Sequence, residues 1–395
     1  MHSSHKPPPD PCANILVALP LMPTNLKRQP EIDALRGLFL VWMVLTHLPT
    51  HMSDLVNQPF GFISSAEGFV FVSALLTCRI YIKQAETSEA GGRVQIWRRA
   101  LQLYLFHLFM LLIAFTVAAA LAVHAHSVAL HNLLNFYLAH PAVAIVGSLF
   151  LVYTPPLLDI LPMYVIYLAL TPWLISAARR YGWRALMLGS GLLWLGAQFG
   201  LRTVVHAAIV RITHLQIPLQ ETGAFNLFSW QLVWTSGLWL GARTAEHKSA
   251  LPRIPAWITA LAAAACLFFI AIRHDWLGPY LAVERIGRLF DKWQLTPLRI
   301  LNLVAFVIVC WSVRSIVKRL LAVEPFLTLG KASLEVFCAH LVFCLVGLAL
   351  LYRDTPQLHG WRAAGLLVCT FAFLIWLAAR VIRKRHEKKR QVAAL

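Results

Sequence analysis

An arginine and two histidines share one apolar stretch near the start of the chain, Pro30–His51 (PEIDALRGLFLVWMVLTHLPTH). Arg36 opens the apolar run, and His47 and His51 lie near its far end. Eleven helical residues rise roughly 16 Å and turn to within about 20° of three full turns, so Arg36 and His47 project from nearly the same face, which His51 extends. Polar groups inside a membrane usually mark a site or a pathway. The alternative is structural: Arg36 snorkels to the interface and His47 bonds a backbone carbonyl.

A carboxylate follows at the start of the next apolar run, SSAEGFVFVSALLTCRIY. The short connection is expected to bring Glu67 close to His47 and His51. A carboxylate that orients an imidazole and raises its basicity is a recurrent catalytic pairing. The structural alternative is that Glu67 complements the helix dipole at an N-terminus, with Ser64 or Ser65 as the N-cap.

Two later runs carry side chains that suit a carbohydrate. TPPLLDILPMYVIYLALTP contains Asp159 and Tyr164, and FNLFSWQLVWTSGLWLG contains Trp230 and Gln231. Aromatic rings and amides of this kind fit sugar rings and hydroxyls. They are equally typical of the aromatic belt at a membrane interface.

A third polar run, LGKASLEVFCAHLVFCL, places Lys331 at its mouth, Glu335 one turn in and His340 at depth. Lys331 and Glu335 can pair at i, i+4, and His340 is a second site candidate. The chain has no HExxH, P-loop or GxSxG motif and no clustered Cys/His set. We therefore expect no metal and no tightly bound cofactor, and a metalloprotease, an ATPase and a serine hydrolase are disfavoured.

The elements that must position these residues are membrane helices. Of the 395 residues, 59% are hydrophobic and only 13% are charged, with a mean hydropathy of +0.66. Soluble domains are closer to half apolar and a quarter charged, so the chain is an integral membrane protein. The seven cysteines form no CxxC pair, and we interpret them as small buried hydrophobes.

The hydropathy pattern predicts an all-α bundle, because a bilayer-spanning helix needs roughly 20 mostly apolar residues. Polar groups interrupt the first, second, sixth and ninth spans, which are therefore expected to face protein or a cavity. Ten spans are predicted: 32–51, 66–84, 100–124, 157–178, 184–208, 227–243, 254–273, 297–317, 332–352 and 361–382.

Basic residues flank alternate ends of these spans, which places both termini in the cytoplasm. The opposite connections 52–65 and 125–156 contain no Lys or Arg, whereas 274–296 is an exception with Arg285, Arg288 and Lys292. The net charge of +18 is accordingly interpreted as basic residues at the inner leaflet, where they contact membrane lipids. Nucleic-acid binding is a poor second interpretation.

Three parts of the chain are expected. Residues 1–30 form a flexible cytoplasmic tail that does not resemble a signal peptide, 31–383 form the membrane domain, and 384–395 form a basic cytoplasmic tail. The apolar segment 141–156 is bounded by prolines and too short for an ordinary span. We predict a re-entrant or interfacial helix there, on the outer side.

The phrases EIDALRGLFLVWMVLTHL, GFISSAEGFVFVSALL, LDILPMYVIYL, FNLFSWQLVWTSGLWLG and LGKASLEVFCAHL together resemble the OpgC family, succinyltransferases of osmoregulated periplasmic glucans. That family is similar to the acyltransferase-3 membrane group, whose Arg-x10-His spacing is met by Arg36 and His47. The resemblance implies a bacterial inner-membrane enzyme with a periplasmic glucan as acceptor. It also implies a cytoplasmic acyl-CoA as co-substrate, which for this family is succinyl-CoA. It leaves the acyl group and the oligomeric state open.

These observations combine into one mechanistic hypothesis. Arg36 and Lys331 attract the CoA phosphates, and His47, oriented by Glu67, acts as general base or passes the acyl group onward. Arg36 can donate a hydrogen bond to the tetrahedral oxyanion only if its guanidinium reaches the thioester. Its separation from His47 instead favours binding of the CoA phosphates. The acceptor side is expected to use His51, Asp159, Tyr164, Trp230, Gln231 and His340.

Two rival functions remain at this stage. A transporter or flippase for a glucan or lipid-linked sugar also needs polar groups at mid-membrane, although no pseudo-symmetric pair of broken helices is evident. An O-acyltransferase acting on another cell-envelope polysaccharide is the second.

Overall fold

The computed structural model describes residues 30–214, 216–246, 254–278, 283–321, 323–351 and 355–393. The tail predicted for 1–30 lies outside these residues except for Pro30. Within them the chain is helical and contains no strand, only one isolated bridge between Thr50 and Leu358. The predicted all-α class is confirmed.

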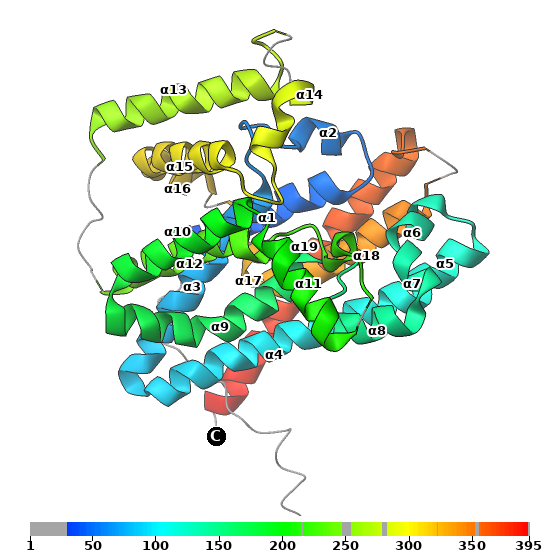
Figure 1. Ribbon diagram of the computed structural model, residues 1–395, viewed down its shortest axis with the longest axis horizontal. Helices are drawn as coiled ribbons and strands as arrows, with labels where there is room; N and C mark the ends of the chain where they lie inside the picture. Colours follow the sequence, from blue (N-terminus) through cyan, green and yellow to red (C-terminus); the bar gives the residue numbers. More distant parts are fainter. Residues whose placement is uncertain are drawn as a thin grey trace, which may run out of the picture.

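The first half of the chain folds into the helices that surround the site (Figure 1). Their bounds are α1 Pro30–His47, α2 Met52–Val56, α3 Ser65–Thr87, α4 Glu89–Ile113, a π-helical turn Ala114–Ala118, α5 Ala119–His124, α6 Val128–Leu133, α7 Asn135–Ala139, α8 Pro141–Leu149, α9 Ile160–Tyr181, α10 Trp183–Gln198 and α11 Leu201–Thr213.

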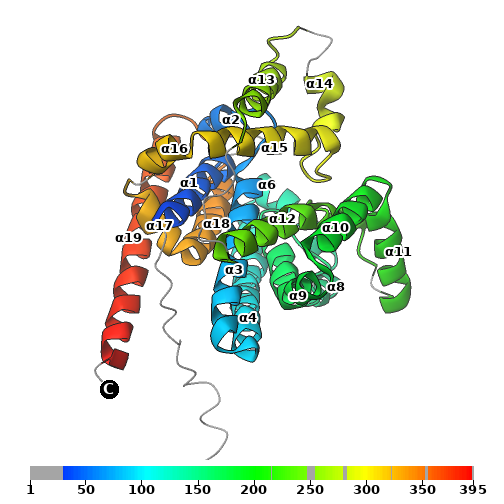
Figure 2. The same ribbon diagram turned by 90° about the vertical axis from the view of Figure 1, so that its left-hand side faces the viewer.

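The second half supplies the helices that pack against them. After a 3-10 turn at Leu219–Thr222 come α12 Leu227–Glu246, α13 Ala256–Arg273, α14 Val283–Ile286, a 3-10 turn Gly287–Phe290, α15 Pro297–Ser312, α16 Arg314–Leu321, α17 Phe326–Lys331, α18 Ser333–Ala349 and α19 Gly360–Ala393. In Figures 1 and 2, α13 and α15 lie beside each other at one side of the molecule.

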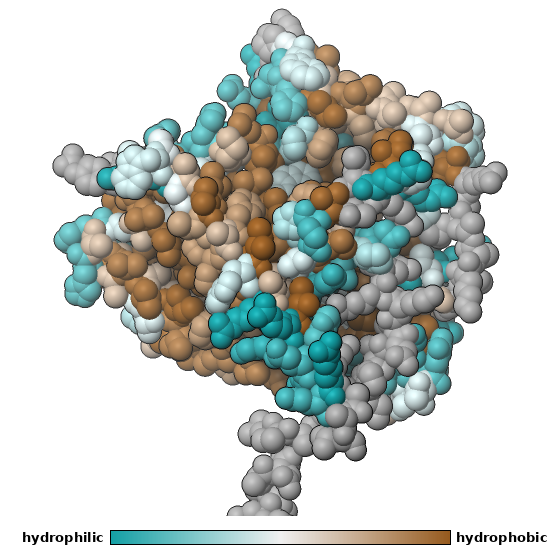
Figure 3. All heavy atoms as spheres, turned by 180° about the vertical axis from the view of Figure 1, so that it is seen from behind, coloured by the Kyte–Doolittle hydropathy of each residue, from teal (hydrophilic) through white to brown (hydrophobic). Residues whose placement is uncertain are grey.

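A helix occupies each of the ten predicted spans, but ten crossings are not confirmed. Five of the described helices are long and apolar enough to cross a bilayer, or six if α10 and α11 form one span. The other predicted spans correspond to α1, α12, α15 and α18, which are shorter or more polar. A broad hydrophobic surface covers much of the face in Figure 3, as expected for contact with lipid.

Two predicted spans differ in shape from the expectation. The span 184–208 is not straight: α10 and α11 meet at an angle of 80°, because Gly200 between them adopts a left-handed conformation at φ +85°. The nine-residue α8 is too short to cross a bilayer, in keeping with the expectation for 141–156. At the C-terminus, α19 continues through the predicted basic tail to Ala393.

Glycines allow the helices around the site to approach closely. A Cβ at Gly37 of α1 would collide with the backbone of Phe326, and one at Gly330 of α17 with the backbone of Asp33. Gly237 and Gly241 lie one turn apart on α12, and Cβ atoms there would fall within 2.5 Å of carbonyl oxygens of α3. Small residues with this spacing are typical of helix contacts inside membranes. They bring α1 into close contact with α17, and α12 into close contact with α3.

Candidate active site

The polar face of α1 is turned toward α18. Arg36 donates a hydrogen bond to the Oγ of Ser333, at the start of α18. Near the other end of α1, Nδ1 of His47 lies 3.4 Å from Nε2 of His340. The two helices therefore run side by side in the same direction. Arg36 and His47 lie on a common face, as their spacing predicts.

The hydrogen bonds of the two imidazoles define which ring nitrogen of His47 is unprotonated. Nδ1 of His340 lies 2.5 Å from the carbonyl oxygen of Phe337, which only accepts, so this nitrogen carries the proton in neutral His340. Nε2 of His340 is then an acceptor, and Nδ1 of His47 donates to it. The rings stack with centroids 5.7 Å apart. His47 therefore keeps an unprotonated Nε2, the atom that a general base requires.

Positive charge gathers where α1 begins, a region that we call the basic end (Arg36, Arg99, Lys331 and Arg385). Arg385 of α19 pairs with Glu335 at 2.7 Å and also donates to the Lys331 carbonyl oxygen, so Glu335 pairs with Arg385 rather than with Lys331. Arg99 lies within electrostatic range of Arg36 and Arg385. An open cavity of about 450 Å³ adjoins this region. Its lining includes Thr328, Lys331, Arg383, His386, Glu387 and Arg390.

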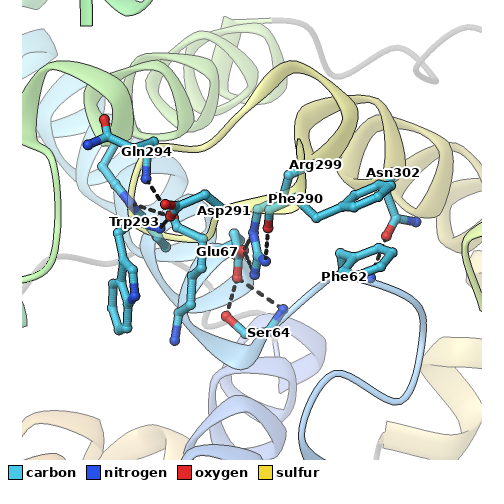
Figure 4. A network of polar contacts seen from close by, with 11 residues as sticks. Phe62, Ser64, Glu67, Phe290, Asp291, Trp293, Gln294, Arg299 and Asn302 are labelled. Carbon is cyan, nitrogen blue, oxygen red and sulfur yellow. Dashed lines mark hydrogen bonds and ion pairs between the residues drawn. The ribbon is translucent and has the colours of Figure 1, made fainter. Parts of the chain in front are cut away.

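Glu67 does not orient His47, contrary to the expectation from sequence. It forms a capping box with Ser64, one of the two N-cap candidates, at the start of α3. Its carboxylate also binds Arg299 of α15, with Nε and a terminal nitrogen 2.7 and 2.5 Å away. Both side chains are almost wholly buried. Figure 4 shows the carboxylate held between Ser64 and Arg299. The partner of His47 is instead His340.

A second charged group lies near this ion pair, in the connection that precedes α15. Lys292 interacts electrostatically with Glu67, Arg299 and Asp159, and also with His47. Asp159 immediately precedes α9 and accepts a hydrogen bond from the Ala224 amide at 3.0 Å. Burial raises the pKa of Asp159 to about 6, opposed in part by that amide and by Lys292. His47 is thus flanked by a polar region at the end away from Arg36.

Two of the residues expected to contact sugar are structural. Trp230 is fully buried, and its indole nitrogen donates to the Lys292 carbonyl oxygen at 3.2 Å. Gln231 binds both the hydroxyl and the carbonyl of Ser190 at 2.7 Å, which ties α12 to α10. Trp230 therefore has no exposed face for a ligand, and the Gln231 amide is already engaged although the residue borders a cavity. Trp293, next to Lys292, has an exposed indole that is 40% accessible.

Tyr164 lies between the two ends of the site. It interacts electrostatically with Arg36, and its ring contacts Phe69, which in turn stacks on Phe337 next to His340. Its buried hydroxyl interacts with the hydroxyl of Ser73. Neither oxygen makes a hydrogen bond of good geometry to any described residue. Such weakly satisfied buried polar atoms are uncommon.

His51 lies outside the site. Helix α1 ends at His47, because Pro49 lacks an amide hydrogen and disfavours helical geometry at Leu48. The helix face shared by Arg36 and His47 consequently does not extend to His51. The His51 side chain is 68% exposed, with its Nδ1 3.5 Å from a carboxylate oxygen of Asp54.

Sequence reasoning missed Arg299 and the role of Lys292. Lys292 was visible only as an exception to the alternation of basic connections. Arg299 falls near the start of a predicted span, and an arginine buried to 1% exposure there is costly unless it is paired. The cost of burying this arginine could have indicated that it pairs with a carboxylate from another part of the chain.

The fold and this arrangement define a helical membrane protein in which the His47–His340 pair lies between a basic end and a polar end. A family model described as OpgC protein matches residues 28–387, nearly the whole chain. The chain belongs to the OpgC family. Membership implies an acyltransferase role connected with osmoregulated periplasmic glucans. No curated protein and no solved structure matches the chain.

Proposed function

We propose that this chain transfers succinyl groups from succinyl-CoA to glucose hydroxyls of osmoregulated periplasmic glucans. The observation that carries the proposal is the His47–His340 pair, which leaves Nε2 of His47 free at the end of α1 remote from Arg36. An acyltransferase needs a base that can accept the proton of a hydroxyl.

The basic end is the proposed donor side. Arg36 and Lys331 supply charge for the phosphates of CoA, and the rise of roughly 16 Å along α1 from Arg36 to His47 is a length that an extended pantetheine arm spans. The amides of that arm need hydrogen-bond partners inside the bundle. The hydroxyls of Ser73 and Tyr164 interact only weakly with each other and are suited to this.

His47 performs the chemistry in this proposal. Its Nε2 takes the proton of a glucose hydroxyl as the hydroxyl oxygen attacks the thioester carbon. The tetrahedral intermediate collapses with loss of CoA thiolate, which recovers the proton from the imidazolium. His340 stabilises that imidazolium by accepting the Nδ1 hydrogen bond. The same Nε2 also serves a relay in which the acyl group passes to His47 first.

The polar end is the proposed acceptor side. Trp293 offers an exposed aromatic face for a glucose ring, and Asp159 a carboxylate for its hydroxyls. The basic connections at alternate span ends support a multi-pass protein of the bacterial inner membrane with both termini in the cytoplasm. In that orientation acyl-CoA enters from the cytoplasm and the glucan binds from the periplasm.

Glucans from a strain that lacks the gene test this function. We expect periplasmic glucans in normal amount that have lost their succinyl esters and negative charge, both restored by the wild-type gene. Glucans retained in the cytoplasm would indicate a transporter. Unchanged glucan charge would indicate a different acceptor. Either outcome contradicts the proposal.

His340 is expected to be a positioning residue, tested by its substitutions. His340→Leu removes the acceptor for Nδ1 of His47, and kcat should fall about 10- to 100-fold, as for other residues that orient a functional histidine. His340→Gln keeps an acceptor oxygen and should recover much of that loss. Equal losses in the two variants, measured on purified protein at matched folding, would assign His340 a packing role only.

A further inference from the structure

The Lys292 side chain is held in an aromatic setting close to the proposed reaction centre. Its ammonium nitrogen lies 4.7 Å from the centre of the Trp293 ring and 5.9 Å from that of Phe225. The backbone is fixed too, because the Lys292 carbonyl accepts the hydrogen bond from the buried Trp230. The ammonium is therefore positioned, with ring faces that tolerate a cation.

Among the described residues, the charge of Lys292 has no direct counter-ion. The two nearby carboxylates are engaged elsewhere, Glu67 by Arg299 and Ser64 and Asp159 by the Ala224 amide. Within the described part of the chain, no carboxylate forms an ion pair with Lys292. Burial accordingly lowers the pKa of its ammonium. A partly desolvated cation of this kind favours a bound anion.

The position of Lys292 relative to His47 indicates which kind of anion it binds. Lys292 acts electrostatically on His47, whereas Arg99 and Arg385 of the basic end act on Arg36. An acyl group whose thioester carbon is at His47 extends its free end away from the sulfur, hence away from the basic end. That free end is the part of the donor that reaches Lys292.

We propose that Lys292 binds the free carboxylate of a dicarboxylic acyl group and thereby selects the acyl donor. This rests on the proposed acyltransferase function and defines its donor class. A neutral acyl group such as acetyl leaves the ammonium without an anion. Sites built around one polar partner reject ligands that lack it by large factors.

The test compares two donors on the same purified full-length protein in proteoliposomes. The ratio of kcat/KM for succinyl-CoA to that for acetyl-CoA, with a β-glucan oligosaccharide as acceptor, should fall at least about 100-fold in Lys292→Gln. Lys292→Arg keeps the charge and should retain most of the preference. Arg288→Gln, an exposed residue of the same segment, removes one charge and should leave the ratio unchanged.

An equal loss with both donors in Lys292→Gln would overturn the proposal, because it would indicate stabilisation of the oxyanion or of the fold. Absence of transfer from any acyl-CoA by the wild type would instead refute the underlying function. Inert thioethers of CoA test the wild type alone: the 3-carboxypropyl derivative should bind at least about tenfold tighter than the butyl derivative. Equal affinities would contradict the role of Lys292 even if its variants fail to fold.

Discussion

Replacement of His47 with alanine should abolish the acyl esters of periplasmic glucans. The substitution removes the proposed base for the hydroxyl proton and the nitrogen that would carry the acyl group in a relay. General-base catalysis alone contributes about 10²- to 10⁴-fold, so residual transfer is expected to fall below detection in cells. Ester content and anionic charge of the glucans measure the loss, at matched abundance of the protein in membranes.

His51→Ala is the matched control for this experiment. It removes a histidine four residues further along the chain that the structure places outside the site, exposed and near Asp54. The control should retain wild-type ester content. Full substitution in His47→Ala would make His47 structural, and His340 would become the next candidate for the base.

Replacement of Arg299 with methionine should destabilise the fold severely. Glu67 is 1% exposed, and removal of its partner leaves a buried carboxylate without compensation, at a cost of about 3–5 kcal/mol. The same carboxylate caps the start of α3 through Ser64, so its destabilisation also affects that helix end. Thermal unfolding of the purified protein in detergent measures the effect, together with its abundance in membranes.

A double variant separates this electrostatic cost from lost packing. Glu67→Leu together with Arg299→Met removes both charges and should recover most of the stability, because buried ion pairs are often replaceable by apolar side chains. Wild-type stability in the single Arg299→Met variant would show that the pair contributes little. It would also remove the structural role that we assign to Glu67.

The sequence predicts the local features of the site well. Periodicity places Arg36 and His47 on one face, and both do face α18. The capping box of Ser64 and Glu67 also follows from local spacing. Each of these depends on residues within a few turns of one helix.

Partners far apart in the chain could not be predicted. His47 and His340 are 293 residues apart, and Glu67 and Arg299 are 232 apart. A single sequence shows which side chains are costly to bury but not which of them compensate one another. Glu67 was therefore assigned to His47 of the neighbouring span, whereas α15 brings a stronger partner to it. Trp230 was likewise misjudged because composition cannot separate a buried indole from an exposed one.

Acyl transfer across a sealed bilayer tests the proposed function most directly. Purified protein is reconstituted into vesicles that hold a β-glucan oligosaccharide inside, and succinyl-CoA is added outside. For protein oriented with its basic end outward, we predict succinyl esters on the enclosed glucan and release of CoA outside, both dependent on His47. Transport of unmodified glucan without release of CoA, or ester formation that persists in His47→Ala, would contradict a histidine-centred acyltransferase.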